Sequence, residues 1–397
     1  MACKDPRKQA RKQVIDKVTY SPRRSFLTVS LLIAILTLFI NTLHSQDMDT
    51  AYTLPDNFSE GPHIFATDSG KVSVMFTASD GVFDLQSGIV SKDDLISCNL
   101  PEQNGSFSFR LRDVAEAGPA EFDVPEKILA ISDIEGNFGG FASILRSSGV
   151  IDSSYNWSFG KGHLVLLGDF FARGKFVTEC LWMIYKLEAE AETAGGKVHF
   201  ILGNHEVMVM RNDLRYVHEK YKKIAELSGT SYDLWFSPDT ELGSWLRKKN
   251  CITKIGNTVF VHGGISPELL ETGLSAEEIN DKLRELIDKP NSNESQAIDS
   301  LIMRGSGPLW YRGIAKREVT GDEIDRMLKH YSADRITIGH SIFDNMSELY
   351  GGRVTAIDID HAENFADGKM YALMIEGNVF RVIDLQGNML ELQKLQE

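Results

Sequence analysis

Cysteine is scarce in this chain: it has four in 397 residues, and no two of them form a Cys-x-x-Cys pair. That absence argues against a zinc ribbon. No cysteine directly follows the apolar segment at residues 26–43, which argues against a lipid-modified cysteine there. Two of Cys98, Cys180 and Cys251 could form a disulfide in an oxidising compartment, although their spacing does not select the pair. Isolated cysteines such as Cys180 and Cys251 are typical of small buried hydrophobic side chains.

Basic side chains are scarce after residue 25. Eight of the 42 Lys and Arg lie in residues 1–25, with only two of the 56 Asp and Glu, so the remainder carries a formal charge of −20. A body this acidic is not expected to bind nucleic acid through a general electrostatic footprint. This overall acidity is still compatible with a local basic pocket that binds phosphate.

Long apolar runs are absent except at residues 26–43, where eighteen consecutive residues carry no charge. The basic residues before this run are typical of an export signal or a membrane anchor. We favour a cleaved signal, cut after Ser45, over an uncleaved anchor, because the run is short for a membrane span. The charge bias keeps residues 1–25 in the cytoplasm and exports the body across the cytoplasmic membrane, periplasmic or anchored to the inner membrane.

The rest of the chain divides by its residue pattern. Residues 44–61 are polar and predict a linker, and residues 62–126 show the period-two alternation of strands between turns. From residue 127 to 397, short apolar runs that end at glycine-containing turns alternate with helical stretches such as 175–195 and 274–288. This pattern predicts a small β-rich N-terminal unit followed by an α/β domain with a layered sheet.

Five polar clusters each follow one of the apolar runs. They contain Asp133, Asp169, Asn204 with His205, His262 and His340. Any one of them could be a helix cap or an ordinary turn. Because open α/β sheets place their ligands at the carboxyl ends of strands, the set together predicts one site. Its carboxylate, amide and imidazole groups are suitable ligands for two divalent cations.

The order of these clusters resembles the calcineurin-like metallophosphoesterases, and within them the phosphoprotein phosphatase superfamily and its bacterial-type, Shewanella-like branch. The resemblance covers roughly residues 127–385. Seven stretches carry it: SDIEGN (132–137), GDFFARG (168–174), GNHE (203–206), ELGSWLRKKN (241–250), VHGGISP (261–267), GPLWYRG (307–313) and GHS (339–341). The resemblance implies a four-layer α/β/β/α sandwich of the α/β (α+β) class and a metal-dependent phosphomonoesterase.

Carried over position by position, the resemblance implies a dinuclear metal centre with six protein ligands. These are Asp133 and Glu135 for the first ion, Asp169 as the bridge between both ions, and Asn204, His262 and His340 for the second ion. Such a centre clamps a phosphate and activates a water for in-line attack. We expect Mn²⁺, with Fe, Zn or Mg as alternatives.

The same resemblance gives three residues roles at the phosphate itself. His205 protonates the leaving oxygen, and Arg173 and Arg312 hold the non-bridging oxygens with their forked donors. Each arginine has a simpler alternative. Arg173 could form a structural salt bridge, and Arg312 could pack beside Trp310.

Glu135 is the first departure from the related motif, which has a histidine at this position. A carboxylate binds hard ions such as Mn²⁺ readily, so the exchange is expected to preserve the metal site. The alternative is that Glu135 points away from the site, as a charge favoured at the start of a helix.

Ala172 is the second departure, because the related pattern has an aspartate here that orients the acid histidine. Without that partner His205 should be a weaker acid, so substrates with good leaving groups, such as aryl phosphates, should suffer least. We therefore expect a tyrosine-leaning phosphoprotein phosphatase that acts on phosphorylated protein or on small phosphomonoesters. The alternatives are a phosphodiesterase or nucleotide pyrophosphatase on the same centre, and a non-catalytic phosphate-binding protein.

Overall fold

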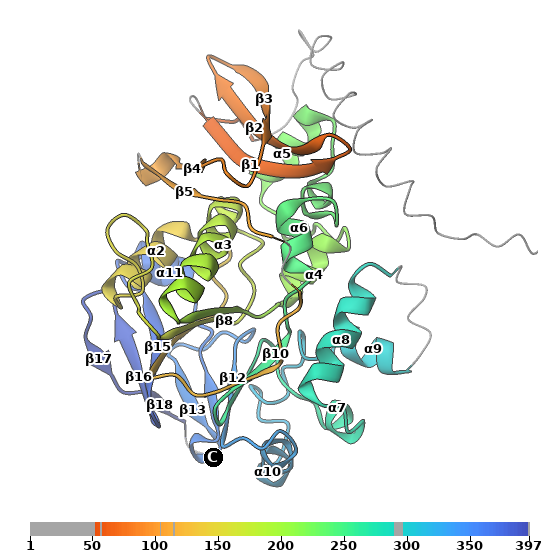
Figure 1. The fold of residues 1–397 in the computed structure, drawn as a ribbon. Helices are drawn as coiled ribbons and strands as arrows, with labels where there is room; N and C mark the ends of the chain where they lie inside the picture. The colour runs from red at the N-terminus through yellow and green to blue at the C-terminus, as the bar shows by residue number, and fades with distance from the viewer. Residues whose placement is uncertain (1–51, 56–57, 104, 114–115, 290–296, 396–397) are drawn as a thin grey trace, which may run out of the picture.

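The computed structural model describes residues 52–55, 58–103, 105–113, 116–289 and 297–395. Two β-sheets form its centre (Figure 1). The seven-stranded sheet has the order β18 (Gln393–Lys394), β13 (Ser347–Leu349), β14 (Val354–Ala356), β12 (Arg335–Ile338), β11 (Thr258–Val261), β10 (Ile252–Ile255), β6 (Glu121–Phe122). The six-stranded sheet has the order β17 (Met389–Leu390), β16 (Val379–Asp384), β15 (Tyr371–Glu376), β7 (Lys127–Ile131), β8 (His163–Leu166), β9 (Lys197–Phe200).

The two sheets pack on each other through one apolar layer. Ile128 and Val165 from the six-stranded sheet lie in the same buried cluster as Phe260 and Ile357 from the side of the seven-stranded sheet. Strands β7, β8 and β9 run parallel and are largely buried, which explains why their sequences are nearly continuous apolar runs. Because these three strands run in the same direction, their carboxyl ends lie at the same edge of the six-stranded sheet.

Helices cover the outer faces of both sheets (Figure 1). On the six-stranded sheet lie α2 (Phe138–Ser147), α3 (Val177–Ala194) and α11 (His361–Ala366). On the other side lie α7 (Pro267–Glu271), α8 (Ala276–Ile287), α9 (Ala297–Met303) and α10 (Gly321–His330). The remaining helical elements are η3 (Pro101–Gln103), α4 (Asn204–Met210), α5 (Glu219–Ser228), η4 (Tyr232–Phe236), α6 (Glu241–Leu246) and η6 (Tyr350–Gly352). The predicted four-layer α/β/β/α sandwich is confirmed.

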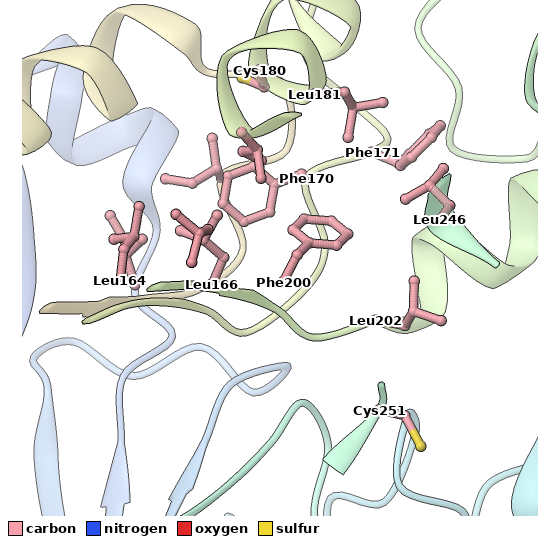
Figure 2. Close-up of a cluster of buried hydrophobic side chains, with 14 of the residues drawn as sticks. Leu164, Leu166, Phe170, Phe171, Cys180, Leu181, Phe200, Leu202, Leu246 and Cys251 are labelled. Carbon is pink, nitrogen blue, oxygen red and sulfur yellow. The ribbon is translucent and has the colours of Figure 1, made fainter. Parts of the chain in front are cut away.

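Helix α3 is fixed to the six-stranded sheet by a dense layer of side chains (Figure 2). Leu164 and Leu166 come from β8, and the rings of Phe170 and Phe200 meet edge to face with their centroids 5.4 Å apart. Burying each such side chain stabilises the fold by roughly 1.5–3 kcal/mol relative to leaving it exposed. Because Phe170 follows Asp169 directly, this layer also fixes the start of a loop that carries candidate site residues.

The described cysteines are Cys98, Cys180 and Cys251, and all three are buried and free. Cys180 lies on α3 above the six-stranded sheet, while Cys251 directly precedes β10 (Figure 2). Their interpretation as small buried hydrophobic side chains is confirmed for Cys180 and Cys251, and no disulfide joins any two of the three.

The N-terminal β-rich unit packs on α3, α5 and α6 (Figure 1). It comprises a sheet of β1 (Phe58–Thr67), β2 (Gly70–Ser79) and β3 (Val82–Val90) and a hairpin of β4 (Ile96–Leu100) and β5 (Gly105–Phe109). Phe109 stacks on Trp182 of α3 with ring centroids 4.2 Å apart, and the Trp182 indole N–H donates to the carbonyl of Pro62 at 2.8 Å. The unit therefore shares the core of the larger domain.

The predicted ranges differ from the structural elements in two places. Strand β1 begins at Phe58, within the range predicted as a linker (44–61), and β6 joins the seven-stranded sheet just before residue 127. The apolar run at residues 26–43 lies outside the described residues. Within the described residues, no helix combines the length and the apolar character needed to span a membrane.

Candidate metal centre

The predicted ligands lie where strands of both sheets end. Asp133 and Asp169 follow β7 and β8, whose parallel pairing aligns Ile131 with Leu166. His262 follows β11, and His340 follows β12, its parallel neighbour in the other sheet. The two edges meet, since the His262 Nε2 atom lies 3.2 Å from the Asp169 Oδ2 atom. The site is therefore built from both halves of the sandwich.

One group of ligand atoms consists of Asp169, His262 and His340, whose donor atoms lie within 4.8 Å of one another. The Nδ1 atom of His262 is 2.6 Å from the carbonyl of Leu167, so Nδ1 donates there and Nε2 is the nitrogen that faces the site. This Nε2 atom lies next to the Asp169 carboxylate and 3.1 Å from the Oδ1 atom of Asn204. Four potential ligand side chains thus converge, as the predicted second-ion site requires.

His340 supplies the clearest sign that this group suits a cation. Its Nε2 atom is buried and has no hydrogen-bond partner within the described part of the chain. Its other side is held by Arg312, which donates to the His340 carbonyl and to the hydroxyl of Ser341 at 3.1 Å. A buried nitrogen without a partner costs free energy, and a divalent cation would satisfy it. The residues present therefore fit a metal ion.

A second group consists of Glu135, Asp169 and His205, again with donor atoms within 4.8 Å of one another. Asp169 is the one residue common to both groups, as expected for a bridging carboxylate. Glu135 faces this centre and forms an ion pair with Arg173. The Nε2 atom of His205 lies 3.6 Å from the Asp169 Oδ2 atom.

Asp133 stands apart from both groups. Its carboxylate accepts hydrogen bonds from the backbone N–H of His340 at 3.1 Å and from the hydroxyl of Ser132. Burial raises the pKa of Asp133 to about 6, against the opposing charge of His262. Asp133 thus joins the two strand ends, and its role as a ligand stays a prediction.

The charges of the centre favour a bound cation. Burial opposes protonation of His262, but the carboxylates of Asp169 and Asp133 outweigh it and raise the pKa of this imidazole to about 10. Burial also opposes ionisation of Asp169, yet the surrounding imidazoles hold its pKa below the ordinary range. The carboxylates thus hold a proton on His262, and a metal ion would take its place.

Left-handed backbone conformations gather in the loops of the site. Several of its residues other than glycine have positive φ, namely Asp133 (52°), Glu135 (47°), Asp169 (55°), Ala172 (75°), Arg173 (44°) and His340 (62°). Such conformations cost free energy and cluster at functional sites. At Gly174 a Cβ atom would lie 2.1 Å from the carbonyl oxygen of Glu135, so only glycine lets these two loops meet.

Glu206 is a residue of the site that the sequence prediction missed. Its buried carboxylate accepts four backbone N–H bonds, from Asp169 (2.9 Å), Phe170 (2.7 Å), Phe171 (3.2 Å) and Gly203 (2.7 Å). It therefore ties the loop after β8 to the loop after β9. The motif GNHE contained a signal for this role. Its glutamate follows a buried strand closely, and a buried carboxylate needs hydrogen-bond donors around it.

We predict that Glu206→Gln lowers the free energy of unfolding by about 3 kcal/mol, because an amide removes the charge and turns a donor toward N–H groups. Calorimetry would show the loss as a lower melting temperature. Glu219→Gln, an exposed change at the start of α5, is the control and should leave it unchanged. Equal melting temperatures for all three proteins would contradict the prediction.

Asp358 is a second residue of the site that the sequence prediction missed. It follows β14 at the position beside His340, because Ile338 pairs with Ala356 in parallel register. Its carboxylate is buried, and one oxygen has no hydrogen-bond partner among the described residues. The same strand-end rule that predicted His340 would have included it.

Tyr216 lies at the rim of the site and is 44% exposed. Its ring meets the imidazole of His205 edge to face at a centroid distance of 5.0 Å. The guanidinium of Arg173 lies 5.3 Å from the centre of the same ring. The ring of Tyr216 thus lies beside His205, the predicted general acid, for which Ala172 provides no carboxylate partner.

Comparison with known proteins agrees with this geometry. The family model for the calcineurin-like phosphoesterases matches residues 126–342. The crystal structure of a cold-active protein-tyrosine phosphatase from a psychrophilic Shewanella species is 32% identical, with a TM-score of 0.76 over 85% of this chain and 100% of that one.

Two sequence relatives extend the comparison. An uncharacterized protein of Schizosaccharomyces pombe is 29% identical over 65% of this chain and 80% of its own length. Shewanella-like protein phosphatase 2 of Arabidopsis thaliana is 26% identical over 62% of this chain and 74% of its own length. The predicted resemblance is therefore confirmed: the chain belongs to the calcineurin-like phosphoesterases, as a metal-dependent phosphoester hydrolase close to the Shewanella-like phosphatases.

Proposed function

We propose that this protein is a phosphomonoesterase with a dinuclear metal centre, and that it prefers tyrosine phosphate in proteins over serine phosphate. The observation that carries the proposal is the carboxylate of Asp169, which is common to both ligand groups. The Shewanella neighbour is a protein-tyrosine phosphatase and the Arabidopsis relative a protein phosphatase, which supports phosphorylated protein as the substrate.

The six predicted ligands divide between two ions. Glu135 and Asp133 would hold the first ion, Asp169 would be shared by both ions, and Asn204, His262 and His340 would hold the second. Bound divalent cations supply Lewis acidity toward the phosphate and lower the pKa of a water, and the carboxylate-rich first site favours Mn²⁺. The protein fixes this arrangement through the Leu167 carbonyl on His262 and the Glu206 carboxylate beneath the loops.

The two arginines bind the phosphate oxygens. Arg173 is 55% exposed at its side chain and is paired with Glu135, so a phosphate can compete for its guanidinium. Arg312 is oriented toward the site through its bonds to the His340 carbonyl and Ser341. Forked guanidinium donors match the geometry of phosphate oxygens better than a lysine would.

His205 donates a proton to the leaving oxygen. Burial, helped by the charge of Arg173, lowers the pKa of His205 against the opposing carboxylate of Asp169. A histidine of lowered pKa carries its proton for less of the time at neutral pH. An aryl leaving group depends little on that proton, whereas an alkyl leaving group depends on it strongly.

We therefore expect kcat/KM for a phosphotyrosine peptide to exceed that for a phosphoserine peptide of the same sequence by about a hundredfold. Phosphate release from the two peptides by the Mn²⁺-loaded protein measures the ratio. Ala172→Asp, which places a carboxylate next to Arg173 again, should raise the phosphoserine rate more than the phosphotyrosine rate. Equal turnover of both peptides would remove the proposed preference.

A further inference from the structure

Lys220 is a buried lysine on α5 whose ammonium group has two oxygen partners. Its side chain is 4% exposed. The Nζ atom lies 2.5 Å from the Oε2 atom of Glu60 on β1, and it donates to the carbonyl of Lys175 at 2.6 Å. Glu60 is itself fully buried and also contacts His63 and Thr178. One ammonium group therefore links the N-terminal sheet to the loop before α3.

Three aromatic rings surround the same ammonium group. Its Nζ atom lies 5.5 Å from the ring centre of Phe58, 5.4 Å from that of Phe176 and 4.8 Å from that of Tyr221. Rings at these distances attract a cation that has lost its water. Phe58 belongs to the N-terminal sheet and Phe176 to the loop, so both elements contribute to the cage.

The carbonyl that Lys220 holds belongs to the loop that carries Arg173. Lys175 comes two residues after Arg173, and its carbonyl also accepts the hydroxyl of Tyr221 at 2.9 Å. The same hydroxyl accepts the backbone N–H of Val177 at 2.8 Å. Side chains of α5 thus fix the end of this loop and the start of α3.

The loop requires such support because its backbone is strained. Ala172 and Arg173 both have positive φ, at 75° and 44°. Residues other than glycine persist in this conformation only when their surroundings hold them there. On the side of the metal centre, the Arg173 N–H donates to the carbonyl of Tyr216 at 2.9 Å, and at the far end the Phe176 N–H donates to the carbonyl of Gly136 at 3.2 Å. Lys220 adds a charged partner at that far end, through the carbonyl of Lys175.

We propose that Lys220 is a positioning residue for Arg173, and that its partner Glu60 couples the N-terminal sheet to the phosphate site. The inference rests on the proposed role of Arg173 in binding phosphate. It gives residues 58–109 a function, because strand β1 carries both Glu60 and Phe58. Neither Lys220 nor Glu60 touches the substrate; they act through the path of the loop.

The test measures the inhibition constant of inorganic phosphate against hydrolysis of an aryl phosphate by the Mn²⁺-loaded, full-length protein. Lys220→Met keeps the length and apolar body of the side chain but removes the charge and the donor. Because this leaves Glu60 without its counter-charge, Lys220→Met/Glu60→Gln is made as well. Both variants should bind phosphate about tenfold more weakly, since small displacements of a positioning group have effects of this size or larger.

Lys223→Met is the matched control. Lys223 lies on the same helix, its side chain is also 4% exposed, and its ion pair is with Glu226 of α5 itself. Losing it should destabilise the helix without moving the loop, so the inhibition constant should stay within about twofold of the original. The same tenfold loss of phosphate affinity in Lys223→Met would overturn the proposal, because the loss would then come from a general destabilisation of α5.

A double-substitution cycle with Arg173→Ala separates positioning from a structural effect. If Lys220 acts through Arg173, Lys220→Met should weaken phosphate binding in the original protein and change it less than about twofold when Arg173 is already alanine. Equal losses in both backgrounds would overturn the inference while leaving the role of Arg173 intact. An unchanged inhibition constant in Arg173→Ala alone would instead remove the proposed phosphate role, and the inference with it.

Discussion

Replacing Asp169 by asparagine is expected to lower kcat/KM for an aryl phosphate by at least about a thousandfold. The carboxylate of Asp169 is the one shared by both ligand groups, so the change weakens two ion sites at once. An amide carries no charge and offers a single good ligand oxygen. The loss should exceed that from any residue that belongs to one group only.

Metal content provides a readout that does not depend on activity. Elemental analysis of the Mn²⁺-loaded protein after dialysis should give about two ions per chain, and fewer than one in Asp169→Asn. Asp344→Asn, an exposed change in the loop after His340, is the control and should alter neither quantity. Two retained ions and full activity in Asp169→Asn would rule out a bridging role for this carboxylate.

Replacing Glu60 by alanine should lower the free energy of unfolding by about 3–5 kcal/mol, because the ammonium of Lys220 would remain buried without a counter-charge. Lys220→Met in the same chain should recover part of this loss. Glu219→Ala is the control, since Glu219 pairs with Lys222 on the same helix and both side chains are exposed, by 66% and 38%. Its effect should stay below about 1 kcal/mol.

The stabilisation by Glu60 should also depend on pH in a defined direction. Burial opposes its ionisation, but Lys220 and His63 outweigh burial and hold the pKa of Glu60 at about 2, below its ordinary 4.5. A lowered carboxylate pKa gives stability that is complete above the ordinary value and is lost as pH falls toward the folded one. Denaturant unfolding of wild type and Glu60→Ala should therefore converge between pH 4.5 and 2. A constant difference would contradict the ion pair.

Most of the candidate ligands could be brought together from sequence because each of them follows an apolar run. Asp169 follows β8 of the six-stranded sheet after two residues, His262 directly follows β11 of the seven-stranded sheet, and the carboxyl ends of those strands meet. The rule needs only local pattern and the general behaviour of α/β sheets. The same rule predicts that Asn204 and His340 belong to the site.

The contacts that support these loops could not be predicted in the same way. Glu60 lies in the range predicted as a linker, and nothing in its local pattern points to Lys220 on a distant helix. The carboxylate of Glu206 was visible in the sequence, but its four N–H donors come from two loops whose approach depends on the whole sheet. Pairing over long sequence separation leaves no periodic signal.

The division of the ligands between the two sheets has a mechanical consequence. Asp169 and Asn204 end strands of the six-stranded sheet, while His262 and His340 end strands of the seven-stranded sheet. A cation bound by all four would cross-link the two sheets non-covalently at this edge, in addition to the hydrogen bonds from His262 to the Leu167 carbonyl and from the His340 N–H to Asp133. By mass action, the cohesion of the sandwich would then depend on the free metal concentration. A chelator that removes the metal would then act on the protein as a mild denaturant. It would weaken the packing between the two sheets, beginning at the edge that carries the candidate site.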